Sequence, residues 1–142
     1  MEKKFILTDK FVINSFGIKL FQIKCTKSFK YAQKGDFGGY VEKEGNLDQE
    51  NDAWVYGNAQ VYGDANIKNN NEHCGFDGFG SCNRHTHAYM TKEKKVEIIC
   101  GCFRGSIEEF EKKVEETHSG TIYEKQYKAI INVIKIKFGL TD

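Results

Sequence analysis

The chain has 142 residues but contains no proline, a single tryptophan and only two arginines against nineteen lysines. No apolar run approaches the roughly 20 residues that a membrane-spanning helix needs, so a helical membrane protein is not expected. The first apolar run, Phe5–Leu7, is far too short for the core of a signal peptide. The five cysteines are an odd number that a reducing compartment would leave as free thiols. These absences together predict a soluble, cytoplasmic protein.

Motifs of enzymatic chemistry are missing as well. Gly75–Gly80 is glycine-rich, but no Gly-Lys-Ser/Thr follows it, which excludes a phosphate-binding loop of the Walker type. A thiol nucleophile needs a nearby base, and the spacing of Cys82 from His85 or His118 enforces no such contact. No Cys-x-x-Cys pair is present, and only weak candidates exist for a zinc site: Cys82, His85, Cys100 and Cys102. We therefore assign no catalytic residue, no metal and no cofactor, and expect a protein that is not an enzyme.

The clearest pattern that is present is a six-residue unit written three times between Ala53 and Asn70. Each unit begins with alanine and carries a branched apolar residue at its third place, namely Val55, Val61 or Ile67. Gly57 and Gly63, with Asn or Asp beside them, tolerate the positive φ that corners between short strands need. The pattern is typical of a hexapeptide β-solenoid, although a plain meander with Gly-Asn and Gly-Asp turns remains an alternative.

The repeat lies within a predicted α+β fold. We expect strands at 5–7, 11–13 and 18–24, a loop at 73–87 that runs into a hairpin of 86–90 with 96–100, and two helices at the C-terminus. Ser106–Glu109 and Thr121–Glu124 are capping boxes that open the helices. Counting back in sixes from Ala53 reaches Leu47 and Val41, which extends the inward frame to about residue 41. Residues 1–72 form a β-rich region and 73–142 the loop, hairpin and helical pair, packed as one domain.

Charge is unevenly distributed along the chain although the net charge is only +1. Residues 1–34 carry eight lysines and two acidic residues, whereas 35–70 carry two lysines and seven acidic residues. This polarity favours contact between copies, so we expect a homo-oligomer. A duplex nucleic acid is not an expected partner, because binders of duplexes usually have a basic surface overall. A local pocket for a small anion remains compatible with these charges.

The best candidates for binding such an anion surround the two arginines. Phe79 lies among glycines, where an aromatic face can be exposed for stacking on a base. The charge of Arg104 and the first N–H groups of the helix that Ser106 opens can converge on one anion. The candidate ligand-binding residues are Phe79, Ser81, Asn83, Arg84, Arg104 and Ser106. The alternative is that each arginine caps local carbonyls or pairs with a nearby glutamate.

Several segments of the sequence resemble those of a known family of proteins. Lys34–Leu47 and the Ala-Trp-Val-Tyr-Gly-Asn units resemble small hexapeptide-repeat proteins of phages and prophages of Gram-positive bacteria. The segments Phe79–Arg84, Cys100–Phe110 and Glu116–His118 resemble the tails of these proteins, so the resemblance covers nearly the whole chain. Such a tail is similar to that of anti-Thoeris counter-defence proteins, which sequester cyclic ADP-ribose signals made by bacterial TIR enzymes.

The resemblance implies a non-catalytic oligomer in the cytoplasm of an infected bacterium, holding a nucleotide between its β part and its C-terminal helices. In the pattern associated with this tail an arginine follows Gly-Ser directly, whereas here Cys82 follows and arginine comes only at position 84. The usual phosphate-binding arginine is therefore shifted or lost. Alternatives are an anti-CRISPR-like inhibitor that binds a host defence protein, a structural assembly protein, and an enzyme that cleaves the signal.

Overall fold

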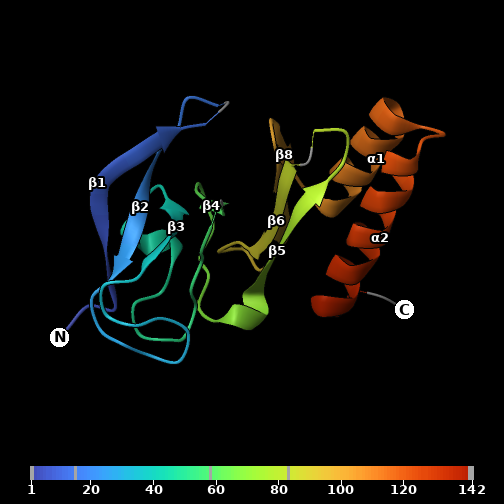
Figure 1. The fold of residues 1–142 in the computed structure, drawn as a ribbon. Helices are drawn as coiled ribbons and strands as arrows, with labels where there is room; N and C mark the ends of the chain where they lie inside the picture. The colour runs from blue at the N-terminus through green and yellow to red at the C-terminus, as the bar shows by residue number, and fades with distance from the viewer. Residues whose placement is uncertain (1, 15, 58, 83, 141–142) are drawn as a thin grey trace.

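The computed structural model describes residues 2–14, 16–57, 59–82 and 84–140, which form a mixed α+β fold of two four-stranded sheets and two helices (Figure 1). The first sheet contains β1 (Phe5–Ile13), β2 (Lys19–Cys25), β3 (Phe37–Val41) and β4 (Gln60–Val61). The second contains β5 (His73–Phe79), β6 (Arg84–Met90), β7 (Val96–Cys100) and β8 (Phe103–Gly105). Two short 3-10 helices, η1 (Glu44–Asn46) and η2 (Asn70–Glu72), precede the helices α1 (Ile107–His118) and α2 (Ile122–Lys137).

The first sheet has the order β1-β2-β3-β4, with antiparallel pairs except for the parallel pair β3–β4. The strands predicted at 5–7 and 11–13 are one continuous strand, β1, whose register with β2 shifts between Leu7 and Phe11. The intervening polar residues therefore interrupt the pairing without ending the strand.

The six-residue units contribute their apolar positions to one core. The three alanines at the first place and the three branched residues at the third place are all buried. Val41 bridges Val61 and Leu47 bridges Ile67, both in parallel and both at a separation of twenty residues. Val41 and Leu47 are buried as expected. They align with the third places of the repeat and not with the first places, because each bridged pair is separated by twenty residues, two more than three six-residue units.

Asn46 links the segment that contains Val41 and Leu47 to the repeat through hydrogen bonds. Its wholly buried side chain donates hydrogen bonds to the carbonyls of Gly63 (3.2 Å) and Ala65 (2.9 Å) and accepts one from the Lys43 N–H (3.1 Å). On the other edge of the same segment, Ala65 forms an antiparallel bridge with Thr91 in the β6–β7 turn. The last unit of the repeat is thus hydrogen-bonded on both edges.

The second sheet is antiparallel throughout, in the order β5-β6-β7-β8, and both of its faces are covered. Ala88, Ile98 and Cys100 belong to the core that the helices cover, whereas Tyr89 and Ile99 belong to the core of the repeat. Figure 1 shows this sheet standing between the N-terminal region and the two helices. The expected hairpin is present as β6 and β7, but the loop expected at 73–87 is wrong, because β5 and the start of β6 occupy most of it.

The helices follow their predicted caps. Ser106 and Glu109 form a complete capping box, and Ile107, Phe110 and Val114 are buried as expected. Thr121 accepts from the Glu124 N–H, but the Glu124 carboxylate accepts from Gly120 rather than closing a second box. No helix in the described part of the chain is long and apolar enough to cross a membrane.

Gly38 offers a test of how tightly β3 packs on the repeat. A Cβ there would lie 2.6 Å from the Val55 carbonyl oxygen and 2.7 Å from the Ile23 side chain. Gly38→Ala should therefore lower the free energy of unfolding by about 1–3 kcal/mol, measured by urea denaturation. Gly45→Ala is the matched control, since a Cβ at Gly45 would meet nothing within 4 Å. Equal stability of the two variants would contradict the packing.

Candidate functional site

Arg84 begins β6 and pairs with Phe79 across the end of β5. Its guanidinium lies against Gly101, which has a φ of 59° in the turn between β7 and β8, and occupies the space that a side chain at Gly101 would fill. Its Nη2 is 3.8 Å from the Cys82 sulfur. Among the described residues, no carboxylate lies within ion-pair distance of this guanidinium. Arg84 is thus a positioned cation whose charge is not neutralised by a neighbouring acid.

Two cavities meet at Arg84. The helix-side cavity has a volume of about 170 Å³ and lies between the sheet and the helices. Besides Arg84, its polar and aromatic lining includes Ser81, Phe103, Phe110, Lys113, Thr117, His118 and Tyr127. The His118 and Tyr127 rings are stacked there, with centres 5.6 Å apart. The cavity combines the two cations Arg84 and Lys113 with three hydroxyl groups, one of them on the Tyr127 ring, and with aromatic walls.

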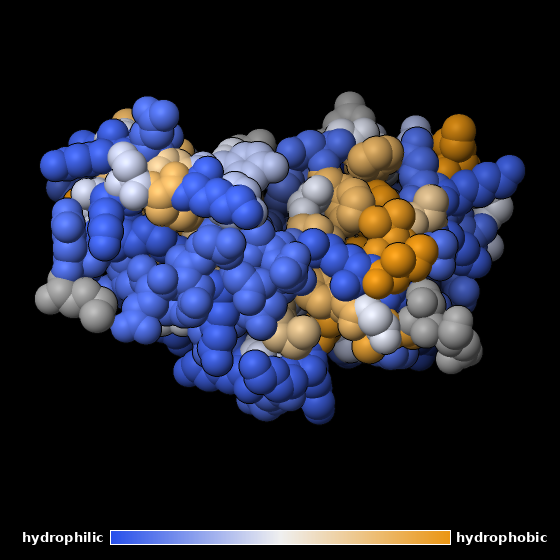
Figure 2. All heavy atoms as spheres, turned by 90° about the horizontal axis from the view of Figure 1, so that it is seen from below, coloured by the Kyte–Doolittle hydropathy of each residue, from blue (hydrophilic) through white to orange (hydrophobic). Residues whose placement is uncertain are grey.

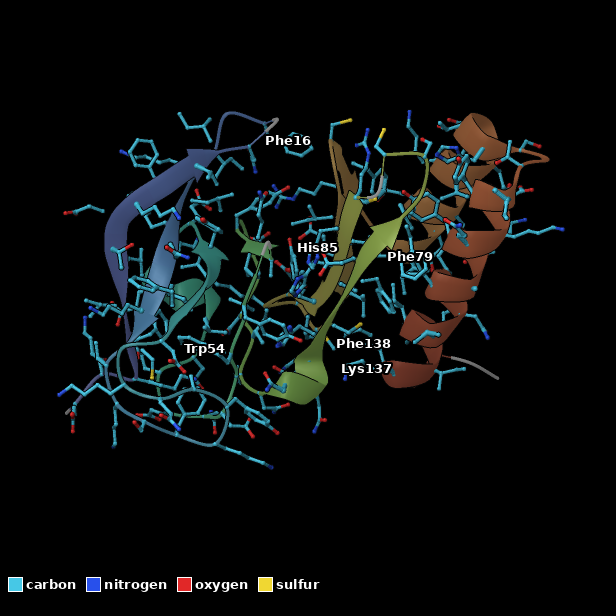
Figure 3. The ribbon with its side chains drawn as sticks, in the orientation of Figure 1. Phe16, Trp54, Phe79, His85, Lys137 and Phe138 are labelled. Atoms are coloured by element: carbon cyan, nitrogen blue, oxygen red, sulfur yellow. The ribbon has the colours of Figure 1, made fainter. Side chains whose placement is uncertain are left out.

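The second, inter-sheet cavity has a volume of about 420 Å³ and lies between the second sheet and the N-terminal region. It is lined by Ile13, Asn14, Gln60, Arg84, His85, His87, Ile99 and Gly101. None of these lining residues is acidic. Figure 3 shows His85 on the side of β6 that faces β4. This cavity therefore has a basic, amide-bearing wall.

The structure does not bring Arg104 into either of these two cavities. Arg104 pairs with Ile99 across β7 and β8 and so lies on the face of the sheet that meets the repeat. Its Nε donates to Glu97 Oε1 at 2.6 Å, and its guanidinium carbon is 4.8 Å from the centre of the Tyr62 ring. The alternative role of pairing with a nearby glutamate therefore describes Arg104, while Arg84 lines both cavities.

The other candidates are also divided. Ser81 lines the helix-side cavity, whereas Phe79 is partly exposed at the end of β5 and does not line that cavity. Ser106 has its N–H engaged by the Glu109 carboxylate (2.9 Å), which occupies the helix N-terminus that was expected to hold an anion. Asn83 lies outside the described residues. Ser81 and Arg84 are the predicted residues that share a cavity.

The weak metal candidates are not assembled. Cys100 faces the helices, where its Sγ lies 3.6 Å from the Tyr127 hydroxyl, and Cys82 and Cys102 are exposed. His85 instead contacts Asp77 and His87. Within the described ranges, no group of three or more histidine, cysteine or acidic side chains is arranged so that it could hold one metal ion.

A row of three imidazoles, which the sequence reasoning missed, runs along the repeat-facing side of β5 and β6. His85 Nδ1 lies 2.6 Å from Asp77 Oδ1, and His85 Nε2 lies 3.3 Å from His87 Nδ1. His87 Nε2 is 3.1 Å from His73 Nδ1, and His73 Nε2 is 2.9 Å from Asn70 Oδ1. The row also lines a third cavity of about 320 Å³ beside Trp54 and Tyr56.

Burial governs the charge of the inner rings. It lowers the pKa of His73 to about 4, with a further contribution from Lys137 of α2. It also lowers the pKa of His87 well below its usual range, and the neighbouring His73 and His85 act in the same direction. His73 and His87 are therefore neutral near pH 7. The one sequence signal for the row was His85-x-His87, which places two imidazoles on one side of a strand.

Comparisons with protein-family models, with curated proteins and with solved structures find no match for this chain.

The reactivity of the Cys82 thiol depends on its contact with Arg84. Hydrogen bonds from Arg84 and Ser81, together with the positive charge of Arg84, lower the pKa of Cys82. Arg84→Gln should raise that pKa, leave less thiolate at about pH 7 and slow alkylation of Cys82 roughly threefold or more. The difference should vanish at high pH, where both thiols are ionised. Mass spectrometry of the Cys82 peptide after iodoacetamide pulses measures the rate, and Lys68→Gln is the control for loss of a distant charge. Identical rates in wild type and Arg84→Gln would contradict the contact.

Proposed function

We propose that the protein binds a small nucleotide-type anion at Arg84 and retains it without chemical conversion. The observation that carries this proposal is a positioned guanidinium at the junction of two cavities, with no acidic partner among the described residues. An arginine fork is well matched to phosphate oxygens, which accept two parallel hydrogen bonds from it. A phosphate would supply a charged hydrogen-bond acceptor to the Arg84 guanidinium, whereas the Arg104 guanidinium already donates to the Glu97 carboxylate.

The helix-side cavity supplies the remaining groups that a nucleotide needs. The stacked His118 and Tyr127 rings offer an aromatic surface to a base, and Ser81 and Thr117 offer hydroxyls to a ribose. Its volume of about 170 Å³ is below the roughly 300–1,000 Å³ typical of ligand sites. One part of the ligand would therefore fill it while the phosphate reaches out to Arg84.

Binding without conversion is supported by the surroundings of the exposed thiol. The hydrogen-bonding partners of Cys82 are Arg84 and Ser81, neither of which is a base for nucleophilic attack. Cys100 Sγ in turn lies within hydrogen-bond distance of Tyr127. The chemistry of the site is thus recognition by charge, stacking and hydroxyl groups.

The biological role that we propose follows the resemblance of the tail and repeat. The protein would act in the cytoplasm of an infected bacterium as a phage counter-defence protein that sequesters a cyclic ADP-ribose or cyclic oligonucleotide signal. An inhibitor that acts on a host protein, and a structural assembly protein, are the alternative roles.

We also propose that the repeat is one coil of a short β-solenoid stacked on a degenerate coil. The parallel bridges Val41–Val61 and Leu47–Ile67, six residues apart, support it. A homo-oligomer is supported by exposed apolar residues such as Val133 and Ile136 of α2. Figure 2 shows hydrophobic surface gathered over the helical half of the visible face.

Calorimetric titration with cyclic ADP-ribose isomers and cyclic oligonucleotides tests the function. We expect one of them to bind, and Arg84→Gln to weaken it roughly 10–100-fold, the effect of losing charge-assisted hydrogen bonds. Lys68→Gln, which removes an exposed positive charge from the repeat, should bind like the wild type. The ligand recovered after denaturation should be chemically intact. Absence of heat with every compound, or recovery of a cleaved product, would overturn the proposal.

A further inference from the structure

The two ends of the imidazole row both present hydrogen-bond acceptors. At one end, Asn70 Oδ1 accepts from the Trp54 backbone N–H at 2.9 Å, which fixes this atom as the oxygen of the amide. The same oxygen faces His73 Nε2 at 2.9 Å. At the other end, the Asp77 carboxylate faces His85 Nδ1 at 2.6 Å. A hydrogen bond at either end therefore requires the proton to come from an imidazole.

The contacts along the row fix the number of protons that it needs. There are four contacts, from Asn70 through His73, His87 and His85 to Asp77, and each needs one proton between its two atoms. Three neutral imidazoles supply only three N–H groups. Hydrogen bonding along the whole row therefore requires one proton more than three neutral rings carry.

The extra proton is best placed on His85, next to the Asp77 carboxylate. His73 and His87 are buried, and Lys137 of α2 adds positive charge near His73. Tyr89 of β6, whose ring centre is 6.2 Å from that of His87, directs its hydroxyl to Glu97 and away from the row. From the repeat, Trp54 and Tyr56 line the neighbouring cavity and supply no carboxylate. Asp77 thus balances an imidazolium at His85.

A protonated His85 would face the inter-sheet cavity together with Arg84. Asn14 lines the same cavity, and its Oδ1 accepts from the N–H groups of Phe16 and Ile18. The Nδ2 of Asn14 is consequently turned the other way, and it is buried with no hydrogen-bond partner among the described residues. An unpaired donor is costly in a buried position, and an oxyanion would satisfy it.

We propose that the imidazole row holds one excess proton and that the inter-sheet cavity is a proton-dependent site for a tetrahedral oxyanion, held by Arg84, His85 and Asn14. The oxyanion is either a free inorganic anion or the phosphate group of a nucleotide. Its affinity is highest when the row is protonated and falls as rising pH removes the proton.

Sulfate is the probe, because its charge stays constant while histidine titrates. Calorimetry of the full chain should show sulfate binding at about pH 6 that weakens roughly tenfold or more by about pH 9. Parallel titrations with inorganic phosphate and adenosine 5′-monophosphate distinguish the two sources of oxyanion. Tighter binding of the monophosphate assigns the site to a nucleotide, and equal binding assigns it to a free anion.

Asp77→Asn is the decisive variant. The amide that this substitution introduces can donate to His85 Nδ1, so three neutral rings, all protonated at Nε2, complete the row without an extra proton. Removing a negative charge should by simple Coulomb attraction strengthen anion binding, but we expect sulfate affinity to fall roughly tenfold and to lose its pH dependence. Glu93→Gln, an exposed change in the β6–β7 turn, is the matched control and should bind sulfate like the wild type.

Imidazole nitrogen NMR gives a second readout that does not depend on a ligand. One imidazolium should be present in the row of the wild type near pH 7, and none in the row of Asp77→Asn. Three neutral rings in the wild type, no sulfate binding, or stronger sulfate binding by Asp77→Asn would overturn the inference. Nucleotide binding that requires Arg84 while sulfate binding is absent would overturn this inference and leave the proposed function standing.

Discussion

The Glu97 carboxylate orients Arg104 at the contact between the second sheet and the repeat. It accepts from the Tyr89 hydroxyl at 2.8 Å and from Arg104 Nε at 2.6 Å, while Arg104 lies over the Tyr62 ring of the repeat. Burial and the charge of Glu97 raise the pKa of Tyr89, so its hydroxyl remains a hydrogen-bond donor. The Arg104 and Glu97 side chains are partly buried, and a hydrogen bond to a charged group typically contributes about 1.5–3 kcal/mol. This network, the buried Tyr89 and Ile99 and the Ala65–Thr91 bridge together set the position of the second sheet against the repeat, and with it the cavities between them.

Local signals in the sequence were sufficient for the helices and the hairpin. The cap at Ser106 and the apolar spacing of Ile107, Phe110 and Val114 predicted α1 because both act within a few residues. The repeat predicted its own buried positions, but the stacking of Val41 on Val61 depends on two extra residues between them and could not be read from the period alone. Strand β5 was missed because its glycines hide the alternation of a strand.

The candidate site, too, could be predicted from the sequence only in part. The rarity of arginine pointed to Arg84 and Arg104 equally, and only the fold places Glu97 beside the second. The imidazole row depends on β5 pairing with β6, which brings His73 next to His87 fourteen residues later. Gly75 has a physical reason in this context, since a Cβ there would lie 2.9 Å from the His85 ring. Its lack of a side chain makes room for the imidazoles.

The bridge between Ala65 and Thr91 bears on how copies of the chain can associate. The Asn66 N–H donates to the Met90 carbonyl, and the Lys92 N–H donates to the Asp64 carbonyl, on the edge of the repeat opposite Leu47. An edge that is left unpaired can form hydrogen bonds with the backbone of another copy. Here the chain's own hairpin pairs with that edge, so another copy cannot add a strand to the repeat at this position.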